Sequence, residues 1–104
     1  MFVYIREAHP SDSNWADDEK LIEEPLTLTQ RGTVASQCSR ELSLTMPMVV
    51  DDMHDTVNQL YGAWPERIYV IDTDGNIAFK GGLGPFGFKP KKAEHALRAL
   101  LDSE

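Results

Sequence analysis

The sequence contains one cysteine, Cys38, so it has neither an internal disulfide nor a Cys-x-x-Cys redox motif. It also lacks an apolar run near the roughly 20 residues that a membrane-spanning helix requires. Basic side chains are scarce, because 10 Lys and Arg stand against 17 Asp and Glu, for a formal net charge of −7. That charge repels phosphate backbones and anionic lipid surfaces, so we expect neither nucleic acid nor a membrane as a partner.

The three histidines, His9, His54 and His95, show no spacing typical of metal ligands, so we expect no metal and no other cofactor. Residues 1–7 contain neither the basic leader nor the apolar core of a signal peptide, which predicts a cytoplasmic location. Of the 104 residues, 41% are hydrophobic and 26% are charged, which is an ordinary globular balance. We therefore expect a single domain over residues 1–104.

The strongest local pattern is a pair of apolar runs at residues 68–71 and 77–79. Asp74 and Gly75 between them form a strong hairpin signal, because glycine adopts positive φ without a Cβ clash. Pro65 stands just before the first run, where its missing N–H costs little. The pattern predicts an antiparallel hairpin opened by proline.

The first half of the chain predicts a strand and a helix joined by a polar, acidic loop over residues 13–25. Consecutive apolar residues at 2–5 favour a strand over residues 2–7 that is covered on both faces. Thr27 or Thr29 can cap a helix that runs to about residue 43. The apolar residues of this helix share one face: Val34, Ala35, Cys38 and Leu42. The polar face is expected to carry Gln30, Arg31, Ser36, Gln37, Arg40 and Glu41.

The second half predicts a short edge strand at residues 46–50, because Pro47 lies within it. Asp51 and Asp52 follow and can cap a helix over residues 53–63, since carboxylates suit a helix N-terminus. The apolar face of that helix is expected to comprise Val57, Leu60, Tyr61 and Trp64. After the hairpin, Pro90 opens a last helix in its preferred first turn. Its core face is expected to comprise Ala93, Ala96, Leu97, Leu100 and Leu101.

Residues 81–88 are rich in glycine, and their Gly-x-Gly spacing invites a phosphate-loop interpretation. No Walker lysine pattern follows, and no strand-to-helix turn of the Rossmann type is predicted, so the motif itself does not support that interpretation.

The order of strands and helices predicts an α/β fold with a mixed sheet, and the proline-led hairpin followed by a helix resembles the closing part of a thioredoxin fold. Three stretches make the resemblance more specific: FVYIREAHPSD, MPMVVDDMHDTVNQLYGAWPERIYVIDTDGNIAFKGG and GPFGFKP. Together they resemble the iodothyronine deiodinase family, and especially its bacterial deiodinase-like members. The resemblance implies a thioredoxin-like mixed sheet with flanking helices, truncated at the N-terminus.

Deiodinases are oxidoreductases that remove iodine reductively from a phenolic ring, with a selenocysteine or cysteine as nucleophile. The resemblance places that nucleophile, with its strand and helix, upstream of the residues that match Phe2. It therefore implies a chain that is inactive alone and needs a thiol reductant. The missing strand leaves three alternatives: the flanking strands pair directly, a second copy or another partner donates a strand, or the chain is part of a longer product. Two other interpretations remain open, a non-catalytic thioredoxin-like binding module and a truncated product without activity.

The resemblance implies that Glu7 and His9, in the family's Glu-x-His, serve catalysis by proton delivery, and that Tyr4 binds substrate. Replacing C–I with C–H requires a proton donor near neutral pH, which suits histidine. The alternative for His9 is a strand-end histidine that the backbone satisfies.

Pro65 and Arg67 are implied in substrate binding, Pro65 as the usually cis proline of the fold and Arg67 through an anionic group. The alternatives are a trans proline that opens the strand and an ion pair from Arg67 to Glu66 or Asp72. Cys38 is weighed as a redox thiol, but a cysteine on an apolar helix face is usually a small hydrophobe.

Overall fold

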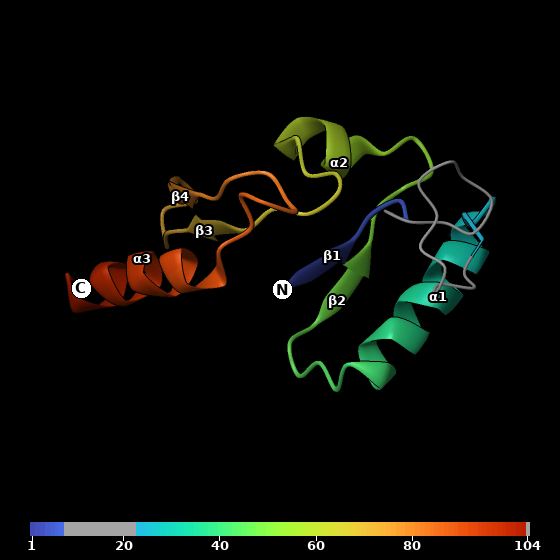
Figure 1. Ribbon diagram of the computed structural model, residues 1–104, viewed down its shortest axis with the longest axis horizontal. Coiled ribbons are helices and arrows are strands. Elements are labelled where there is room, and N and C mark those ends of the chain that lie inside the picture. The colour runs from blue at the N-terminus through green and yellow to red at the C-terminus, as the bar shows by residue number, and fades with distance from the viewer. Residues whose placement is uncertain (8–22, 104) are drawn as a thin grey trace. The chain divides into compact units, whose positions relative to one another are not determined.

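The computed structural model describes residues 1–7 and 23–103 (Figure 1). The chain forms two compact units, Met1–Tyr61 and Gly62–Glu104, and each is described by itself. The expected single domain stays a prediction. Among the described residues, no helix combines the length and apolar character needed to cross a membrane. His9 and most of the loop predicted for residues 13–25 lie outside the described residues.

The first unit is built on a parallel pair of short strands. β1 (Phe2–Tyr4) pairs with β2 (Met48–Val50) in the register Phe2 to Met48 and Tyr4 to Val50. α1 (Leu28–Glu41) lies against β2, and α2 (Thr56–Tyr61) follows it (Figure 1). The strand predicted over residues 2–7 and the helix predicted over residues 53–63 are therefore both real but shorter than expected.

The α1 helix begins as predicted at Thr27, whose hydroxyl accepts a hydrogen bond from the Gln30 N–H at 3.1 Å. Ala35 is buried, as its place on the apolar face predicts. Two expectations for this helix are wrong. Leu42 is 64% exposed at the C-cap, and Arg31, expected on the polar face, is 2% exposed. The helical period alone assigns faces, whereas burial depends on which partners the rest of the unit supplies.

The second unit is an antiparallel hairpin covered by a helix. β3 (Tyr69–Ile71) pairs with β4 (Ile77–Lys80), and α3 (Pro90–Asp102) contacts both strands (Figure 1). Val70 and Ala93 are buried between them. The predicted hairpin and last helix are confirmed, although Leu97 and Leu101 on the expected core face stay substantially exposed.

The hairpin loop is held by Asp72 rather than by Asp74 and Gly75 alone. The Asp72 Oδ1 atom accepts hydrogen bonds from the N–H groups of Asp74 and Asn76 at 3.0 and 2.9 Å. Gly75 has φ of +87°, which a residue with a Cβ adopts only with strain. A bulge between Val70 and Ile71 then brings Ile71 opposite Ile77. The predicted turn is thus present, as part of a longer loop.

Gly32→Ala will raise the free energy of unfolding of the first unit by about 0.5–1 kcal/mol, because alanine loses less backbone entropy within a helix. Gly32 lies inside α1, and a Cβ at this position meets no atom within 4 Å. Urea denaturation followed by circular dichroism measures the change. Gly75→Ala, in the hairpin of the second unit, should instead destabilise that unit, because of its positive φ. A loss of stability in Gly32→Ala would contradict the open space around this helix.

Candidate functional site

The candidate site of the first unit contains a partly buried hydrogen bond at the end of β1. The Tyr4 hydroxyl donates to Oε2 of Glu7 across a short separation of 2.5 Å, and Glu7 is 7% exposed. Burial raises the pKa of the Tyr4 phenol well above its usual range, and the hydrogen bond and negative charge of Glu7 raise it further. The phenol therefore stays protonated at neutral pH and is fixed on the carboxylate.

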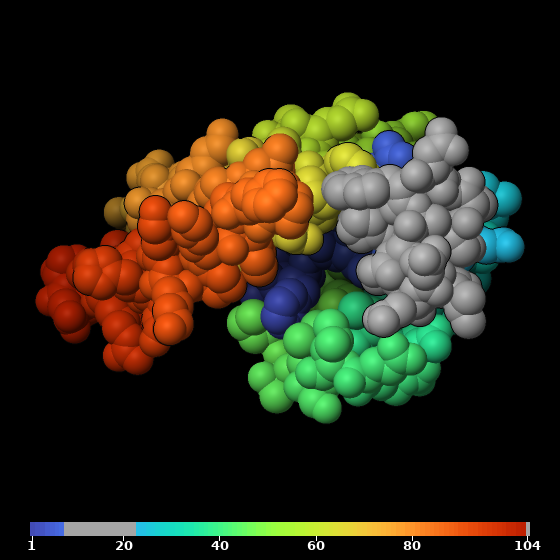
Figure 2. All heavy atoms as spheres, in the orientation of Figure 1, coloured from blue at the N-terminus to red at the C-terminus, as the bar shows by residue number. Residues whose placement is uncertain are grey.

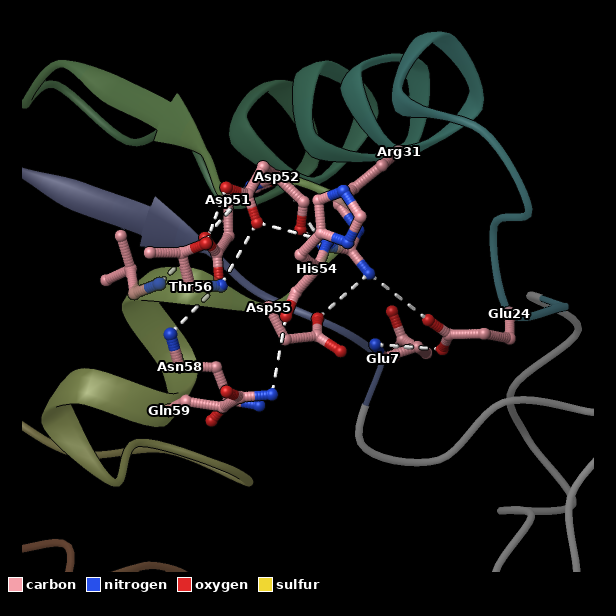
Figure 3. A network of polar contacts seen from close by, with 11 residues as sticks. Glu7, Glu24, Arg31, Asp51, Asp52, His54, Asp55, Thr56, Asn58 and Gln59 are labelled. Carbon is pink, nitrogen blue, oxygen red and sulfur yellow. Dashed lines mark hydrogen bonds and ion pairs between the residues drawn. The ribbon is translucent and has the colours of Figure 1, made fainter.

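A carboxylate and a guanidinium support Glu7 from outside β1 (Figure 3). The Glu7 N–H donates to Oε2 of Glu24 at 3.0 Å, and Oε1 of Glu24 lies 3.6 Å from Nη2 of Arg31. Burial raises the pKa of Glu24, while the hydrogen bond from Glu7 and the positive charge of Arg31 act in the opposite direction. The chain after the Tyr4–Glu7 pair is thereby tied to α1.

Arg31 also binds the loop between β2 and α2. Its Nη1 donates to the carbonyl oxygens of Asp52 at 2.7 Å and Asp51 at 3.3 Å, and its Nη2 donates to Oδ1 of Asp55 at 3.3 Å. Figure 3 shows the guanidinium between Glu24 and this loop. A planar fork of N–H donors suits such bridging, which an ammonium group does not reproduce. One side chain of α1 therefore connects two separate loops of the unit.

Asp51 forms hydrogen bonds with both α2 and β1. It is 2% exposed, and its carboxylate accepts hydrogen bonds from the N–H groups of Val57 at 3.0 Å and Asn58 at 2.9 Å. Its own N–H donates to the Tyr4 carbonyl oxygen at 2.8 Å. Asp51 thus satisfies N–H groups at the start of α2 that have no carbonyl partner within the helix, while it extends the pairing of β1.

Asp52 binds the first turn of α2 from the outside. Its carboxylate accepts from the Thr56 N–H at 3.0 Å and from the Thr56 hydroxyl at 2.6 Å. The Thr56 hydroxyl, followed by its backbone N–H, lowers the pKa of this exposed carboxyl group. The predicted capping by Asp51 and Asp52 is confirmed, but Leu60, expected on the apolar face of this helix, is 77% exposed.

The second unit contains the other two predicted binding residues. The Trp64–Pro65 peptide bond is cis, as expected for the proline of this fold, and Pro65 is partly exposed just before β3. Arg67 Nη1 donates to the Gly62 carbonyl oxygen at 3.0 Å. Beside it, the Gly84 N–H donates to the Glu66 carbonyl oxygen at 2.9 Å. The substrate-binding roles of Pro65 and Arg67 stay predictions.

The structure brings together some predicted site residues and adds others. Tyr4 and Glu7 form a contact, whereas His9 lies outside the described residues. Cys38 is a free, partly exposed thiol on α1, and its redox role stays untested. The described residues contain no cluster of side chains suited to a metal ion. Local sequence signals indicate neither the contact of Glu24 with Glu7 nor the burial of Arg31, because Glu7 lies 17 residues before Glu24, and Asp52 and Asp55 lie 21 and 24 residues after Arg31.

Mixed α/β units with small sheets and flanking helices are compatible with a thioredoxin-like fold. A family model described as iodothyronine deiodinase matches residues 1–102, so the chain belongs to the iodothyronine deiodinase family. It is 37% identical over 93 residues to type I iodothyronine deiodinase of Xenopus laevis, covering 88% of this chain and 36% of that protein. It is 38% identical over 103 residues to thyroxine 5-deiodinase of Gallus gallus, covering 98% of this chain and 38% of that protein.

A third relative is type II iodothyronine deiodinase of Petromyzon marinus, which is 38% identical over 106 residues. That match covers 99% of this chain and 36% of the relative. The chain thus spans little more than a third of the length of these vertebrate relatives. The resemblance to bacterial members of the family stays a prediction.

The Tyr4 phenol makes stability fall at high pH. Because its pKa is raised in the folded state, its contribution is complete below the unfolded pKa near 10 and is lost as pH rises above it. Between about pH 9 and about pH 11, wild-type protein should therefore lose more stability than Tyr4→Phe. Urea midpoints at the two pH values measure the difference. Equal losses would show that Tyr4 ionises as easily in the folded chain as in the unfolded one.

Proposed function

We propose that this chain carries substrate-binding and proton-delivering residues of a deiodinase-like oxidoreductase. The observation that supports the proposal most is the partly buried hydrogen bond from Tyr4 to the buried Glu7, in a chain that belongs to the iodothyronine deiodinase family. A structural role alone does not require a buried carboxyl group beside a phenol, since apolar side chains fill such a place at lower cost. The pair has the composition of a proton-handling site.

The proposed reaction is reductive removal of halogen from an aromatic ring. An aryl iodide and two thiols give the arene, iodide, a proton and a disulfide. The nucleophile takes the iodine from the carbon, the carbon takes a proton, and a thiol reductant then releases iodide from the nucleophile. The carbon needs its proton as the carbon–iodine bond breaks, so a positioned donor accelerates the step.

Each predicted residue receives a role in this proposal. Tyr4, fixed by Glu7, presents a protonated phenol toward substrate, and His9 on the following segment delivers the proton. Glu7 holds Tyr4 in place, and its backbone N–H binds Glu24, which lies beside Arg31. Arg67 binds an anionic group of the substrate, because its guanidinium suits carboxylates.

The nucleophile of the proposed reaction is a separate question. The only cysteine, Cys38, lies on α1 and has neither an adjacent resolving cysteine nor a helix N-terminus beside it. By its resemblance to the family, we propose that the nucleophile belongs to a segment upstream of the residues that match Phe2, and we expect residues 1–104 alone to be inactive. The cytoplasmic location, the thiol reductant, and a homodimer or strand-donating partner also stay predictions.

A chimera tests the proposal. The segment that precedes the matched region in type I iodothyronine deiodinase of Xenopus laevis is fused before Phe2, and iodide release from an iodinated phenol is assayed with a dithiol. We expect release from the chimera and none from residues 1–104 alone. A chimera whose nucleophile is replaced by serine gives the background. A folded chimera that releases no iodide above this background rejects the proposal.

A further inference from the structure

Positive charge is concentrated in one part of this acidic chain. Residues 75–93 contain four of the five lysines and no aspartate or glutamate, although the whole chain has a net charge of −7. In the space-filling view this segment, coloured orange, is visible at the surface of the second unit (Figure 2). None of these lysines has a part in the proposed dehalogenation, so their concentration requires a separate explanation.

Three of these lysines line one pocket. The pocket has a volume of about 260 Å³, and Lys80, Lys89 and Lys92 lie around it together with the Phe79 side chain. Lys80 ends β4, Lys89 is the N-cap of α3, and Lys92 lies in the first turn of that helix. The fold of the unit thus brings together lysines from a strand and a helix.

These lysines have no acidic partner in the part of the chain that the structure describes. Among the described residues, the side chains of Lys80, Lys89 and Lys92 form neither an ion pair nor a hydrogen bond. Like charges that converge without a counter-charge repel one another, and a multivalent anion removes that repulsion. The chain has an excess of carboxylates, yet none of those within residues 1–7 and 23–103 is paired with this group.

The remaining wall of the pocket is backbone. Gly81, Gly82 and Gly87 line it, and a Cβ on Gly82 would lie 2.8 Å from the Gly87 carbonyl oxygen. A Cβ on Gly87 would lie 2.6 Å from the Leu83 carbonyl oxygen, so both positions require glycine. The loop is closely packed, since the Gly81 and Gly87 N–H groups donate to the carbonyl oxygens of Ile68 and Leu83 at 2.8 and 2.9 Å. The N-terminus of α3 has no capping hydrogen bond from a side chain. The helix dipole places partial positive charge at this end, near Lys89 and Lys92.

We propose that this pocket binds a compact oxyanion of the phosphate class. Three ammonium groups favour an anion that carries more than one negative charge. A single carboxylate carries only one. The volume is several times the roughly 30 Å³ share of one water molecule, which leaves room for phosphate or pyrophosphate with some hydration. The site does not depend on a Walker motif, because its charge comes from separate elements rather than from one loop. It is independent of the proposed dehalogenation.

The experiment titrates residues 1–104 with sodium pyrophosphate at low salt, by calorimetry and by amide chemical shifts. We expect saturable binding, with shifts at Gly81, Gly82, Gly87 and Lys92. Lys89→Gln should weaken binding about tenfold, the effect of losing one charge-assisted hydrogen bond, and Lys80→Gln should act in the same direction. Thermal unfolding verifies that both variants are folded.

Lys91→Gln is the matched control. This substitution also removes one positive charge from the start of α3, but Lys91 does not line the pocket. We expect this variant to weaken binding less than about threefold, through the general field alone. Equal weakening in Lys89→Gln and Lys91→Gln, or citrate binding as tightly as pyrophosphate, overturns the proposal. Adenosine monophosphate and inorganic phosphate are titrated in parallel. Tighter binding of the nucleotide assigns the site to the phosphate of an organic ester, and equal binding assigns it to the free ion.

Discussion

Replacing Arg31 with methionine will lower the free energy of unfolding of the first unit by about 3–5 kcal/mol, the usual cost of removing one partner from a buried ion pair. The guanidinium is 2% exposed and lies against Glu24, Asp55 and two backbone carbonyl oxygens. Methionine fills much of the space, but it leaves these oxygens without a donor. Buried acceptors that lose their partner retain the full cost of leaving water.

Urea denaturation of the variant, followed by helical circular dichroism, measures this change. Arg40→Met is the control, because Arg40 is an exposed arginine in the last turn of the same helix. Its loss should cost less than about 1 kcal/mol, through the helix dipole alone. Arg31→Lys should fall between the two, since it keeps the charge but not the fork of donors. If Arg31→Met is no less stable than Arg40→Met, the bridging by Arg31 does not stabilise the unit.

Glu7→Gln in the chimera will lower iodide release by at least about 100-fold, the lower range for removal of a group that acts in proton transfer. The substitution preserves size and removes the charge that holds the Tyr4 hydroxyl. Packing should survive because the amide is isosteric with the carboxylate. The loss should therefore appear in the rate at saturating substrate, with little change in the melting temperature.

Initial rates of iodide release across the pH range measure this effect. Glu23→Gln removes an equal charge from an exposed residue next to Glu24 and should leave the rate within a factor of about two. Tyr4→Phe should lower the rate in the same direction, since it removes the hydroxyl that Glu7 binds, whereas Glu7→Gln leaves a weaker, neutral acceptor. A Glu7→Gln chimera that keeps the rate of Glu23→Gln would exclude Glu7 from proton delivery and leave it a structural role.

Local sequence signals predicted the elements that depend on neighbours in the chain. Thr27 caps α1 through Gln30, three residues away, and Asp51 and Asp52 cap α2 from just before it. The hairpin depends on residues 72–76, which form its loop. In each case the physical cause lies within a few residues, so pattern and propensity are sufficient. The contact of Tyr4 with Glu7 also spans only three positions.

Contacts between distant segments were not predictable in this way. Arg31 follows the polar pattern of α1, yet three of its partners, Asp51, Asp52 and Asp55, lie 20 or more residues further along the chain. Leu60 follows an apolar pattern and remains exposed. Periodicity shows which residues of a helix lie on the same side, but not what covers that side. The lysine pocket was missed for the same reason, since its members are supplied by a strand, a loop and a helix.

The buried carboxylate of Asp51 caps α2 and should also slow the exchange of the amide protons of α2 with deuterium. Amides in the first turn of a short helix normally exchange fast, because they have no carbonyl partner. The N–H groups of Val57 and Asn58 donate to the Asp51 carboxylate. The backbone of Asp51 in turn accepts from Arg31 and donates to the Tyr4 carbonyl oxygen. They can open only when the arginine network and the strand pairing open with them. The beginning of this helix is therefore expected to be its slowest-exchanging part.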